Sequence, residues 1–379
     1  MLLVASFPDS ILKFRGALIL AILEAGNAVH VAAPGLPPGA AIRSSLEALG
    51  VKVHDIPLGR TGTNPLADLK LLSHLCGLFR GVRPDVFLGY TIKPVIYGTI
   101  AAWMAGVPRR FALVTGLGYA FTGNRQGIVK RVVSGLYRFA LGRTHKVFFQ
   151  NPDDERLFRE LGIAPAGIPS VVVNGSGVDV AAFPVTPLPG SPPVFLLIGR
   201  LLGDKGVREF AEAARKVTAL HPEARFHAVG WIDSNPDAIA QSELDAWVAD
   251  GTLEFLGKLD DVRPAIAAST VYVLPSYREG TPRTVLEAMA MGRPIITTDA
   301  PGCRETVING DNGFLVPVQS VDALVEAMLK FITDPALAPR MGRRSRQMAE
   351  DKYDVHKVNA VMLREMGIIR AATDGETQA

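Results

Sequence analysis

Short runs of β-branched and other apolar residues alternate with segments of helical periodicity along almost the whole chain. In the first half the apolar runs predict seven strands, at Leu2–Phe7, Val29–Ala33, Val51–Ile56, Val86–Gly89, Phe111–Val114, Val147–Gln150 and Ser170–Val173. In the second half they predict six, at Val194–Ile198, Phe226–Val229, Leu253–Leu256, Val271–Leu274, Ile295–Thr298 and Phe314–Val316. Helical patterns lie between them, for example over Lys13–Glu24, Val207–Ala219 and Asp322–Ile332. This alternation predicts parallel sheets built from βαβ units.

A proline-rich stretch, Phe183–Pro193, separates the two sets of predicted elements. It holds five prolines and no helical pattern, which is typical of an interdomain linker. We therefore expect an α/β protein with two doubly wound, Rossmann-like domains, residues 1–184 and 185–352, that face a central cleft. Ligands of such sheets bind beyond the carboxyl ends of the strands. The segment 353–379 is expected to pack back on the first domain and to end in a frayed tail over 371–379.

Composition agrees with a two-domain globular protein. The chain has 379 residues, of which 48% are apolar and 20% charged. Only Cys76 and Cys303 are present, so we expect a reducing compartment and no disulfide framework. No uncharged apolar stretch reaches the roughly 18–20 residues of a membrane span, and Cys303 lacks a local device that would activate it as a nucleophile.

The formal net charge of +3 is unevenly distributed. Residues 1–184 hold 19 Lys or Arg against 11 Asp or Glu, whereas residues 185–379 hold 21 against 26. This asymmetry indicates an anionic partner for the first half, or simply a basic soluble domain. Ile128–Arg143 mixes apolar and basic residues at helical spacing, as in helices that lie on anionic lipid, although such a stripe usually faces its own sheet. A nucleic-acid partner is not expected, because aromatic interleaving and recognition motifs are lacking.

Two glutamates, Glu279 and Glu287, straddle the start of a predicted helix. Thr281 is the expected N-cap and Pro282 the expected first helical residue. The exposed amides and the dipole of such a helix start favour a phosphate. A carboxylate on each side of a phosphate site suggests a sugar nucleotide, with one acid for each of two sugar rings.

The first strand–helix turn of the second half carries Gly199, Arg200 and Lys205. Gly199 permits a turn at the strand end, and the two cations can converge on a diphosphate. The corresponding turn of the first half, residues 6–10, contains no glycine, which disfavours an NAD(P) enzyme. The seven histidines show no metal-ligand spacing such as H-x-x-x-H, so we expect no metal site.

Three motifs together resemble the family 4 retaining glycosyltransferases. They are Gly-Arg-Leu-x-x-x-Lys-Gly at 199–206, the two glutamates with seven residues between them, and Asn-Gly-x-Gly-Val-Asp at 174–179. The resemblance covers nearly the whole chain. It implies the GT-B fold, a nucleotide-sugar donor, and catalysis without a metal or any other cofactor.

The resemblance also implies roles for individual residues. Arg200 and Lys205 would hold the donor diphosphate. Glu279 would lie against the donor sugar, and Glu287 would bind the ribose hydroxyls. The amides that would meet the phosphates belong to the loop that contains Gly280, Thr281 and Thr284.

The segments Thr91–Gly98, Thr115–Phe121 and Arg278–Arg283 resemble one bacterial subgroup. It includes N-acetylgalactosaminyltransferases that extend a sugar on undecaprenyl diphosphate. The resemblance implies a UDP-N-acetylhexosamine donor, UDP-N-acetylgalactosamine first, and a polyprenyl-diphosphate-linked acceptor. The protein would then work peripherally against the inner leaflet, on the cytoplasmic face of the inner membrane. The candidates for meeting the acceptor diphosphate are three basic residues of the first domain: Lys13, Arg15 and Lys93.

Other functions remain open at this point. A family 4 transferase could use galactose, glucose or GDP-mannose for exopolysaccharide or O-antigen. A UDP-sugar epimerase on the same two-domain fold would convert the donor without an acceptor. A non-catalytic sugar-nucleotide-binding protein is disfavoured, because a decayed site would have little reason to keep all four of Arg200, Lys205, Glu279 and Glu287.

Overall fold

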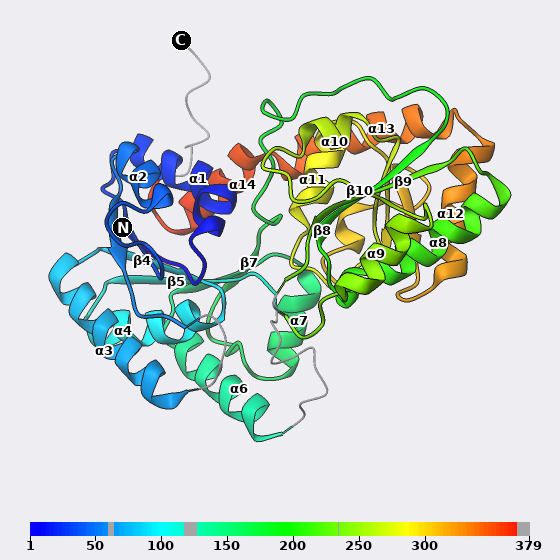
Figure 1. The fold of residues 1–379 in the computed structure, drawn as a ribbon. Coiled ribbons are helices and arrows are strands. Elements are labelled where there is room, and N and C mark those ends of the chain that lie inside the picture. The colour runs from blue at the N-terminus through cyan, green and yellow to red at the C-terminus, as the bar shows by residue number, and fades with distance from the viewer. Residues whose placement is uncertain (60–63, 117–126, 234, 370–379) are drawn as a thin grey trace, which may run out of the picture. The chain divides into compact units, whose positions relative to one another are not determined.

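The computed structural model describes residues 1–59, 64–116, 127–233 and 235–369. The chain forms two compact units (Figure 1). Unit 1 consists of Met1–Ser176 and the C-terminal segment from His356, and unit 2 consists of Gly177–Val355. Each unit is built on one parallel sheet, so the predicted α/β class with two doubly wound domains is confirmed.

Unit 1 contains a seven-stranded sheet with the order β3-β2-β1-β4-β5-β6-β7. Its strands are β1 (Leu2–Val4), β2 (His30–Ala33), β3 (Lys52–Asp55), β4 (Val86–Tyr90), β5 (Arg109–Val114), β6 (Lys146–Phe149) and β7 (Ser170–Val172). Its helices are α1 (Asp9–Glu24), α2 (Ala41–Ala48), α3 (Pro65–Val82), the π-helix η1 (Pro94–Gly98), α4 (Thr99–Met104), α6 (Ile128–Leu141), α7 (Pro152–Glu160) and α14 (Val355–Glu365).

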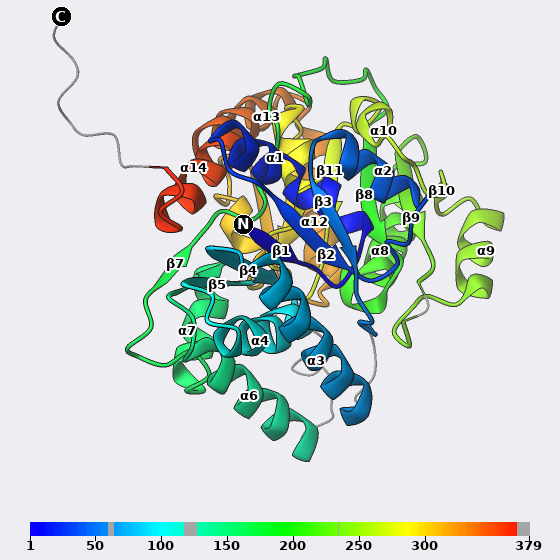
Figure 2. The same ribbon diagram turned by 90° about the vertical axis from the view of Figure 1, so that its left-hand side faces the viewer.

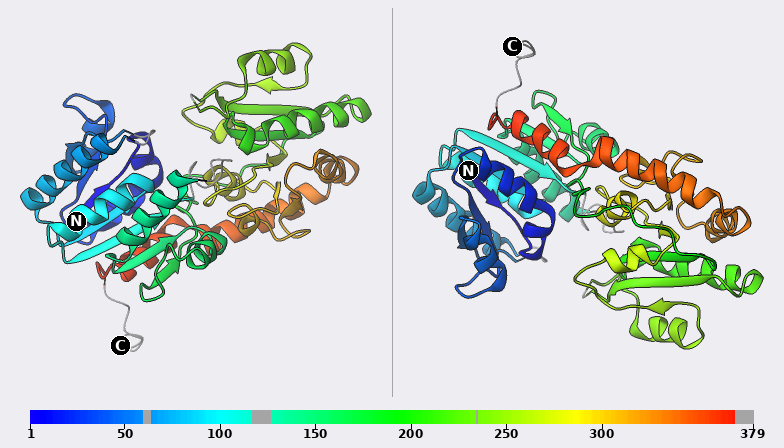
Figure 3. Two further views of the ribbon diagram at one scale, coloured as in Figure 1. Left: turned by 90° about the horizontal axis from the view of Figure 1, so that it is seen from below. Right: turned by 90° about the horizontal axis from the view of Figure 1, so that it is seen from above.

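The sheet of unit 1 separates two helical layers, because successive strand residues point to opposite faces. Leu3 of β1 belongs to the core beneath α1, α2 and α14. Leu2 and Val4 belong to the core beneath α3 and α4 on the other face. Figures 2 and 3 show α14 in red beside the sheet, far in sequence from its neighbour α1.

Unit 2 contains a six-stranded sheet with the order β10-β9-β8-β11-β12-β13. Its strands are β8 (Val194–Arg200), β9 (Arg225–Trp231), β10 (Glu254–Phe255), β11 (Val271–Leu274), β12 (Ile295–Thr298) and β13 (Gly313–Val316). Its helices are the 3-10 turns η2 (Gly203–Lys205) and η3 (Arg304–Thr306), α8 (Val207–Leu220), α9 (Gln241–Ala249), α10 (Arg263–Ala267), α11 (Arg283–Ala290), α12 (Val321–Thr333), α13 (Leu337–Met348) and the π-helix η4 (Ala349–Tyr353).

Each of the thirteen predicted strands is present, and the three named helical patterns are α1, α8 and α12. The differences lie at the ends of elements. Strand β1 stops at Val4 instead of Phe7, whereas β9 continues to Trp231, two residues past its predicted end. Element ends depend on pairing partners and loop contacts, which local hydrophobicity does not record.

The division between the units falls after Ser176, not within the proline-rich stretch where the sequence placed it. That stretch is anchored to unit 2, because the buried Arg293 donates to the Thr186 carbonyl (3.0 Å) and the Pro187 carbonyl (3.1 Å). The chain returns from unit 2 to unit 1 after Val355, three residues beyond the predicted boundary at 352/353. The predicted frayed tail over 371–379 lies outside the described residues.

Candidate functional site

Strand β8 carries Arg200 to the carboxyl end of the sheet in unit 2. The predicted turn at Gly199 is wrong, since the strand runs through Gly199 and pairs it with Gly230 of β9. A Cβ on Gly230 would lie 1.8 Å from the Gly199 carbonyl oxygen, so the two strand ends pack too closely for a side chain there. Beyond this pair, Arg200 Nη1 lies 3.1 Å from Asp233 Oδ2.

Lys205 ends the short turn η2, and the glycine after it fixes where that turn lies. Gly206 has φ +70°, and a Cβ there would lie 2.2 Å from the Pro275 carbonyl oxygen. Only glycine adopts this conformation at low cost and leaves room for such contact. The Tyr277 amide donates to the Asp204 carbonyl at 2.8 Å. The turn is thus packed, backbone against backbone, on the loop that follows β11.

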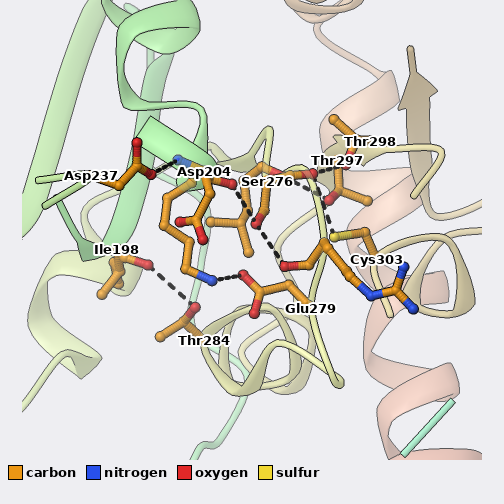
Figure 4. Close-up of polar contacts among 12 residues, drawn as sticks. Ile198, Asp204, Asp237, Ser276, Glu279, Thr284, Thr297, Thr298 and Cys303 are labelled. Atoms are coloured by element: carbon orange, nitrogen blue, oxygen red, sulfur yellow. Dashed lines mark hydrogen bonds and ion pairs between the residues drawn. The ribbon is translucent and has the colours of Figure 1, made fainter. Parts of the chain in front are cut away.

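This packing brings Lys205 to Glu279, which is labelled in Figure 4. Lys205 Nζ lies 2.5 Å from Glu279 Oε1, and the two side chains are only 14% and 16% exposed. Burial lowers the pKa of Lys205, but the carboxylates of Glu279 and Asp204 outweigh burial and raise the pKa overall. The positive charge of Arg200 lies close enough to Lys205 to lower this pKa in part. The two basic residues therefore gather at one strand end with Lys205 protonated at neutral pH.

The loop after β12 supports the backbone of Glu279. The Glu279 amide donates to the Pro301 carbonyl at 2.9 Å. Gly302 has φ +79°, and a Cβ there would lie 2.1 Å from the Glu279 carbonyl oxygen. A residue larger than glycine at 302 would therefore displace the segment that carries Glu279.

Cys303 belongs to the same supporting loop (Figure 4). It is fully buried, and its Sγ donates to the Ser276 carbonyl at 3.8 Å. The Thr298 hydroxyl donates to the same carbonyl oxygen. Burial raises the pKa of Cys303 to about 12, so the thiol stays protonated at neutral pH. This environment suits a structural residue and not a nucleophile.

Helix α11 begins one residue later than predicted. The N-cap position is Pro282, with extended backbone (φ −73°, ψ 109°) and no side-chain cap, so Arg283 is the first helical residue. The Thr281 hydroxyl donates to the Gly280 carbonyl instead of accepting from the helix. The N-cap role of Thr281 and the first helical position of Pro282 are therefore both wrong. The hydroxyl already has a local acceptor, and local side-chain hydrogen bonds of this kind compete with capping.

A buried tyrosine ties the start of α11 to the end of β8. The Tyr272 hydroxyl donates to Thr284 Oγ1 at 2.6 Å, and Thr284 donates to the Ile198 carbonyl at 3.3 Å. Arg283, the first residue of α11, places its Nε 2.8 Å from Oε1 of Glu287, one turn further along the helix. Glu287 is 7% exposed, which makes this carboxylate a buried, oriented acceptor at the edge of the site.

The three basic candidates of unit 1 have different surroundings. Lys13 is exposed on α1. Arg15 is 2% exposed, with its guanidinium carbon 5.4 Å from the centre of the Tyr90 ring. Lys93 Nζ lies 2.8 Å from Asp68 of α3, so a carboxylate neutralises it. Their contact with an acceptor diphosphate stays a prediction.

Metal sites and membrane-spanning helices can be assessed only for the described residues. Among the described residues, no three His, Cys, Asp or Glu side chains form a group that could hold a metal ion. Within the same ranges, none of the helices has the length and apolar character needed to cross a membrane. Of the motif Thr115–Phe121, residues 117–121 lie outside the described residues.

Sequence reasoning missed several residues that build this site. Arg283 carried a usable signal, since it stands four positions before Glu287 on a predicted helix. The glycines at 206 and 302 gave a weaker signal, because their close backbone contacts are tertiary. Asp233 gave no signal, because it meets Arg200 only through the pairing of β8 with β9.

Comparison with known proteins identifies the family. Residues 15–175 match the model of the glycosyl transferase 4-like domain, and residues 192–334 match that of the glycosyl transferases group 1. An Escherichia coli relative, UDP-Gal:α-D-GlcNAc-diphosphoundecaprenol α-1,3-galactosyltransferase, is 30% identical over 77% of this chain and 77% of its own length. The chain belongs to the family 4 glycosyltransferases. It is therefore an enzyme, a hexosyltransferase, as the motifs predicted.

Other relatives of this glycosyltransferase agree. A Campylobacter jejuni protein, N,N′-diacetylbacillosaminyl-diphospho-undecaprenol α-1,3-N-acetylgalactosaminyltransferase, is 29% identical over 90% of this chain and 91% of its own. Sucrose-phosphate synthase from Thermosynechococcus elongatus superimposes with a TM-score of 0.79, at 18% identity, over 96% and 97% of the two chains. Anabaena HepE, solved with UDP-glucose, reaches 0.74 at 18% identity over 97% and 99%. The two solved structures confirm the GT-B fold.

Proposed function

We propose that this glycosyltransferase moves an N-acetylhexosamine, N-acetylgalactosamine in first place, from a UDP-sugar to a polyprenyl-diphosphate-linked saccharide. The observation that carries the proposal is the gathering of Arg200, Lys205 and Glu279 at one strand end of unit 2. The names of both relatives support the acceptor class, because each names a sugar linked through diphosphate to undecaprenol. The product would enter a bacterial surface glycan or a protein-glycosylation pathway.

On the donor side, Arg200 and Lys205 would bind the diphosphate. Charge grows on that group as its bond to the sugar breaks, so cations held in place stabilise the transition state more than the ground state. The amides around Gly280, Thr281 and Thr284 would meet the same phosphates, next to the start of α11. HepE, a protein with the same fold, has been solved with UDP-glucose, which favours a uridine nucleotide.

The two glutamates would serve different parts of the donor. Glu279, beside Lys205, would orient the sugar ring and favour positive charge at its anomeric carbon. Glu287 would accept from the ribose hydroxyls, and Arg283 would hold its carboxylate in place. A carboxylate that is 7% exposed and already oriented loses little entropy when it binds a hydroxyl pair.

We infer a retaining transfer by attack on the same face of the sugar. The bond between the anomeric carbon and the diphosphate oxygen breaks, and the acceptor hydroxyl oxygen bonds to that carbon. The hydroxyl proton passes to the departing phosphate oxygen, so this route uses no protein nucleophile, metal or cofactor. In the described residues around Glu279, the one thiol, Cys303, is buried and protonated, and so it does not compete for the nucleophile's role.

The acceptor also suggests where the enzyme works. A polyprenyl chain keeps the acceptor in a bilayer, so we place the protein peripherally on the cytoplasmic face of the inner membrane. The excess of Lys and Arg in residues 1–184, 19 against 11 acidic residues, favours contact with the anionic inner leaflet.

The test combines a substrate matrix with two variants. UDP-GalNAc, UDP-GlcNAc, UDP-Gal, UDP-Glc and GDP-mannose are each incubated with polyprenyl-diphosphate mono- and disaccharides, and products are read by mass spectrometry. Arg200→Ala and Lys205→Ala should each lower turnover by roughly 10²–10³-fold, as loss of an oxyanion-stabilising donor does. Arg208→Ala is the control, because that arginine pairs on the surface with Glu243. Unchanged turnover and donor affinity in Arg200→Ala would contradict the proposal that Arg200 binds the donor diphosphate.

A second candidate donor is galactose, which the E. coli relative's name favours. The substrate matrix separates the two, because transfer from UDP-Gal without any transfer from a UDP-N-acetylhexosamine would overturn our first choice. An epimerase would form a new UDP-sugar without acceptor, whereas a transferase of this kind releases UDP only when acceptor is present.

A further inference from the structure

Exposed apolar side chains occur on three neighbouring helices of unit 1. Helices α3, α4 and α6 lie together on the same side of its sheet (Figures 1 and 2). In the described part of the chain, six of the sixteen exposed large apolar residues stand on these three helices. They are Leu66 (78% exposed), Leu69 (63%), Trp103 (43%), Met104 (52%), Val132 (54%) and Phe139 (41%). We name this surface, with its basic residues, the α3–α4–α6 face.

Its centre is a cluster of two aromatic rings and one guanidinium. Trp103 of α4 and Phe139 of α6 meet edge to face with their ring centres 6.0 Å apart. The guanidinium carbon of Arg143 lies 3.8 Å from the centre of the Phe139 ring and 4.9 Å from that of Trp103. Trp is enriched at the headgroup level of bilayers, and helices that lie in this region combine Trp or Phe with Lys or Arg.

Arg131, Arg138 and Arg143 give this face a positive charge. Between Asp85 and Asp153 the sequence has nine Lys or Arg residues and no acidic residue; of these, Lys93 pairs with Asp68 and Lys146 with Glu365. Arg131 and Arg138 are exposed on α6. With the described residues, neither they nor Arg143 form an ion pair; Arg143 instead donates to the Phe139 carbonyl at 3.4 Å. By contrast, the exposed Arg208 and Arg215 of unit 2 pair with Glu243 and Asp250.

The apolar residues of this face are not the inward stripe of α6. The side of α6 that faces the sheet carries Tyr137, Ala140 and Leu141, which are at most 1% exposed and belong to the core with Phe158. Val132 and Phe139 lie on the outward side of the same helix. Since the core is already filled without them, their exposure calls for a partner outside the unit.

The charge decides which partner fits. A second copy of this chain would bring the same positive charge against itself, which costs free energy. An anionic bilayer supplies phosphates for the guanidinium groups and an apolar interior for the rings. We propose that the α3–α4–α6 face docks directly on an anionic lipid surface, with Trp103 and Phe139 inserted at headgroup depth.

This inference extends the proposed function, since it makes membrane contact direct and independent of the lipid-linked acceptor. The test is co-sedimentation with acceptor-free vesicles of phosphatidylglycerol and phosphatidylethanolamine, compared with phosphatidylcholine alone. The wild-type protein should bind the anionic vesicles and lose binding as salt rises. Trp103→Ser with Phe139→Ser should weaken the partition by about tenfold or more, because two apolar side chains no longer leave water.

Charge is tested separately with Arg138→Glu and Arg143→Glu, which should abolish the preference for anionic vesicles. The matched control is Leu220→Ser with Val248→Ser, which removes two exposed apolar residues (64% and 45%) from unit 2. Thermal melts check that each variant is folded. The proposal is overturned if the wild type ignores acceptor-free anionic vesicles, or if the control loses as much binding as the Trp103 and Phe139 variant.

A soluble short-chain acceptor distinguishes this proposal from the proposed function. The variants of the α3–α4–α6 face should keep wild-type turnover on that acceptor, because their side chains lie outside the candidate donor site. A wild-type protein that binds vesicles but transfers no sugar would refute the proposed function and leave the docking surface standing. Loss of turnover on the soluble acceptor, in folded variants of the face, would refute a pure docking role.

Discussion

Two candidate cations of the donor site are already held by carboxylates. Lys205 pairs with Glu279 at 2.5 Å and Arg200 with Asp233 at 3.1 Å. In such pairs the carboxylate compensates the buried or half-buried cation for its lost hydration. It also fixes the position of the cation. A diphosphate that binds the same cations must compete with these carboxylates. Binding of the donor would therefore replace a carboxylate by a phosphate at these cations.

The first prediction follows from that competition. Glu279→Gln removes a negative charge beside Lys205, so UDP should bind about three- to tenfold more tightly, as expected for loss of one nearby like charge in a partly screened site. Turnover should fall in the same variant, because the sugar ring loses its carboxylate. Calorimetry of UDP binding and a steady-state transfer assay measure the two effects.

Glu243→Gln is the control for that variant, because Glu243 is a salt-bridged glutamate on the surface of unit 2. It should leave both UDP affinity and turnover unchanged. Weaker UDP binding by Glu279→Gln would show that Glu279 helps to hold the nucleotide and does not compete with it.

At the scale of elements, glycine contacts set the spacing between the turn η2 and the loop after β11. Gly206→Ala places a Cβ 2.2 Å from the Pro275 carbonyl at φ +70°. We expect a loss of about 2 kcal/mol or more in the free energy of unfolding, because strain and overlap add. Turnover should fall too, since Lys205 precedes this residue. Urea unfolding and the transfer assay measure both.

Gly251 offers a matched control for this substitution. It has φ +75° in the same unit, but no atom lies within 4 Å of the place that a Cβ would occupy. Gly251→Ala should therefore lose only about 1 kcal/mol in the free energy of unfolding, the part that comes from backbone strain. It should keep full turnover. Equal losses in the two variants would contradict a role for the close approach to Pro275.

The strand pair β2–β3 gives a pH-dependent prediction. His30 Nδ1 and His54 Nε2 lie 2.9 Å apart, and burial, with the charges of His54 and Lys52, lowers the pKa of His30 to about 4. The unfolded chain, with a His pKa near 6.5, binds more protons than the folded one between these values. The stability of unit 1 should therefore fall as pH drops from about 6.5 through about 4.

His30→Gln should make that decline shallower, because one of the two titrating rings is removed. The melting temperature at pH 7 and at pH 4.5, compared between variant and wild type, measures the difference. His221→Gln, on unit 2, serves as the control and should keep the wild-type slope. An unchanged slope in His30→Gln would show that other groups govern acid sensitivity.

The sequence predicted every strand because alternation of apolar runs and helices is local information. It also predicted that Arg200, Lys205 and Glu279 belong together, on the strength of a family resemblance. It misplaced the start of α11, since the Thr281 hydroxyl bonds to Gly280 instead of capping. The Asp233 and Pro275 contacts depend on which strands and loops become neighbours, and no local pattern encodes that.

At the scale of the whole molecule, unit 1 is made from both ends of the chain. Its core includes Val358, Met362, Leu363 and Met366, each at most 5% exposed. Ending the chain after Val355 removes these side chains, each of which contributes about 1.5–3 kcal/mol by burial. We predict that unit 1 unfolds in the truncated protein and that unit 2 keeps its own melting transition.

Limited proteolysis with mass spectrometry separates the two units in that experiment. Unit 1 should be digested and a fragment close to 177–355 should survive. A synthetic peptide of residues 355–369, added in trans, should restore protection of unit 1. Full resistance of unit 1 in the truncated protein, without the peptide, would contradict the requirement for α14.

The position of α14 has a consequence for biosynthesis. A ribosome releases residues 1–176 before unit 2, yet the apolar surface that receives α14 stays uncovered until α14 emerges. Unit 2 is complete before that moment. Domains usually mature in the order of translation, but here unit 1 is translated before unit 2 and is completed after it. The nascent chain therefore carries this uncovered apolar surface through most of its synthesis, and that surface is where a ribosome-associated chaperone would bind.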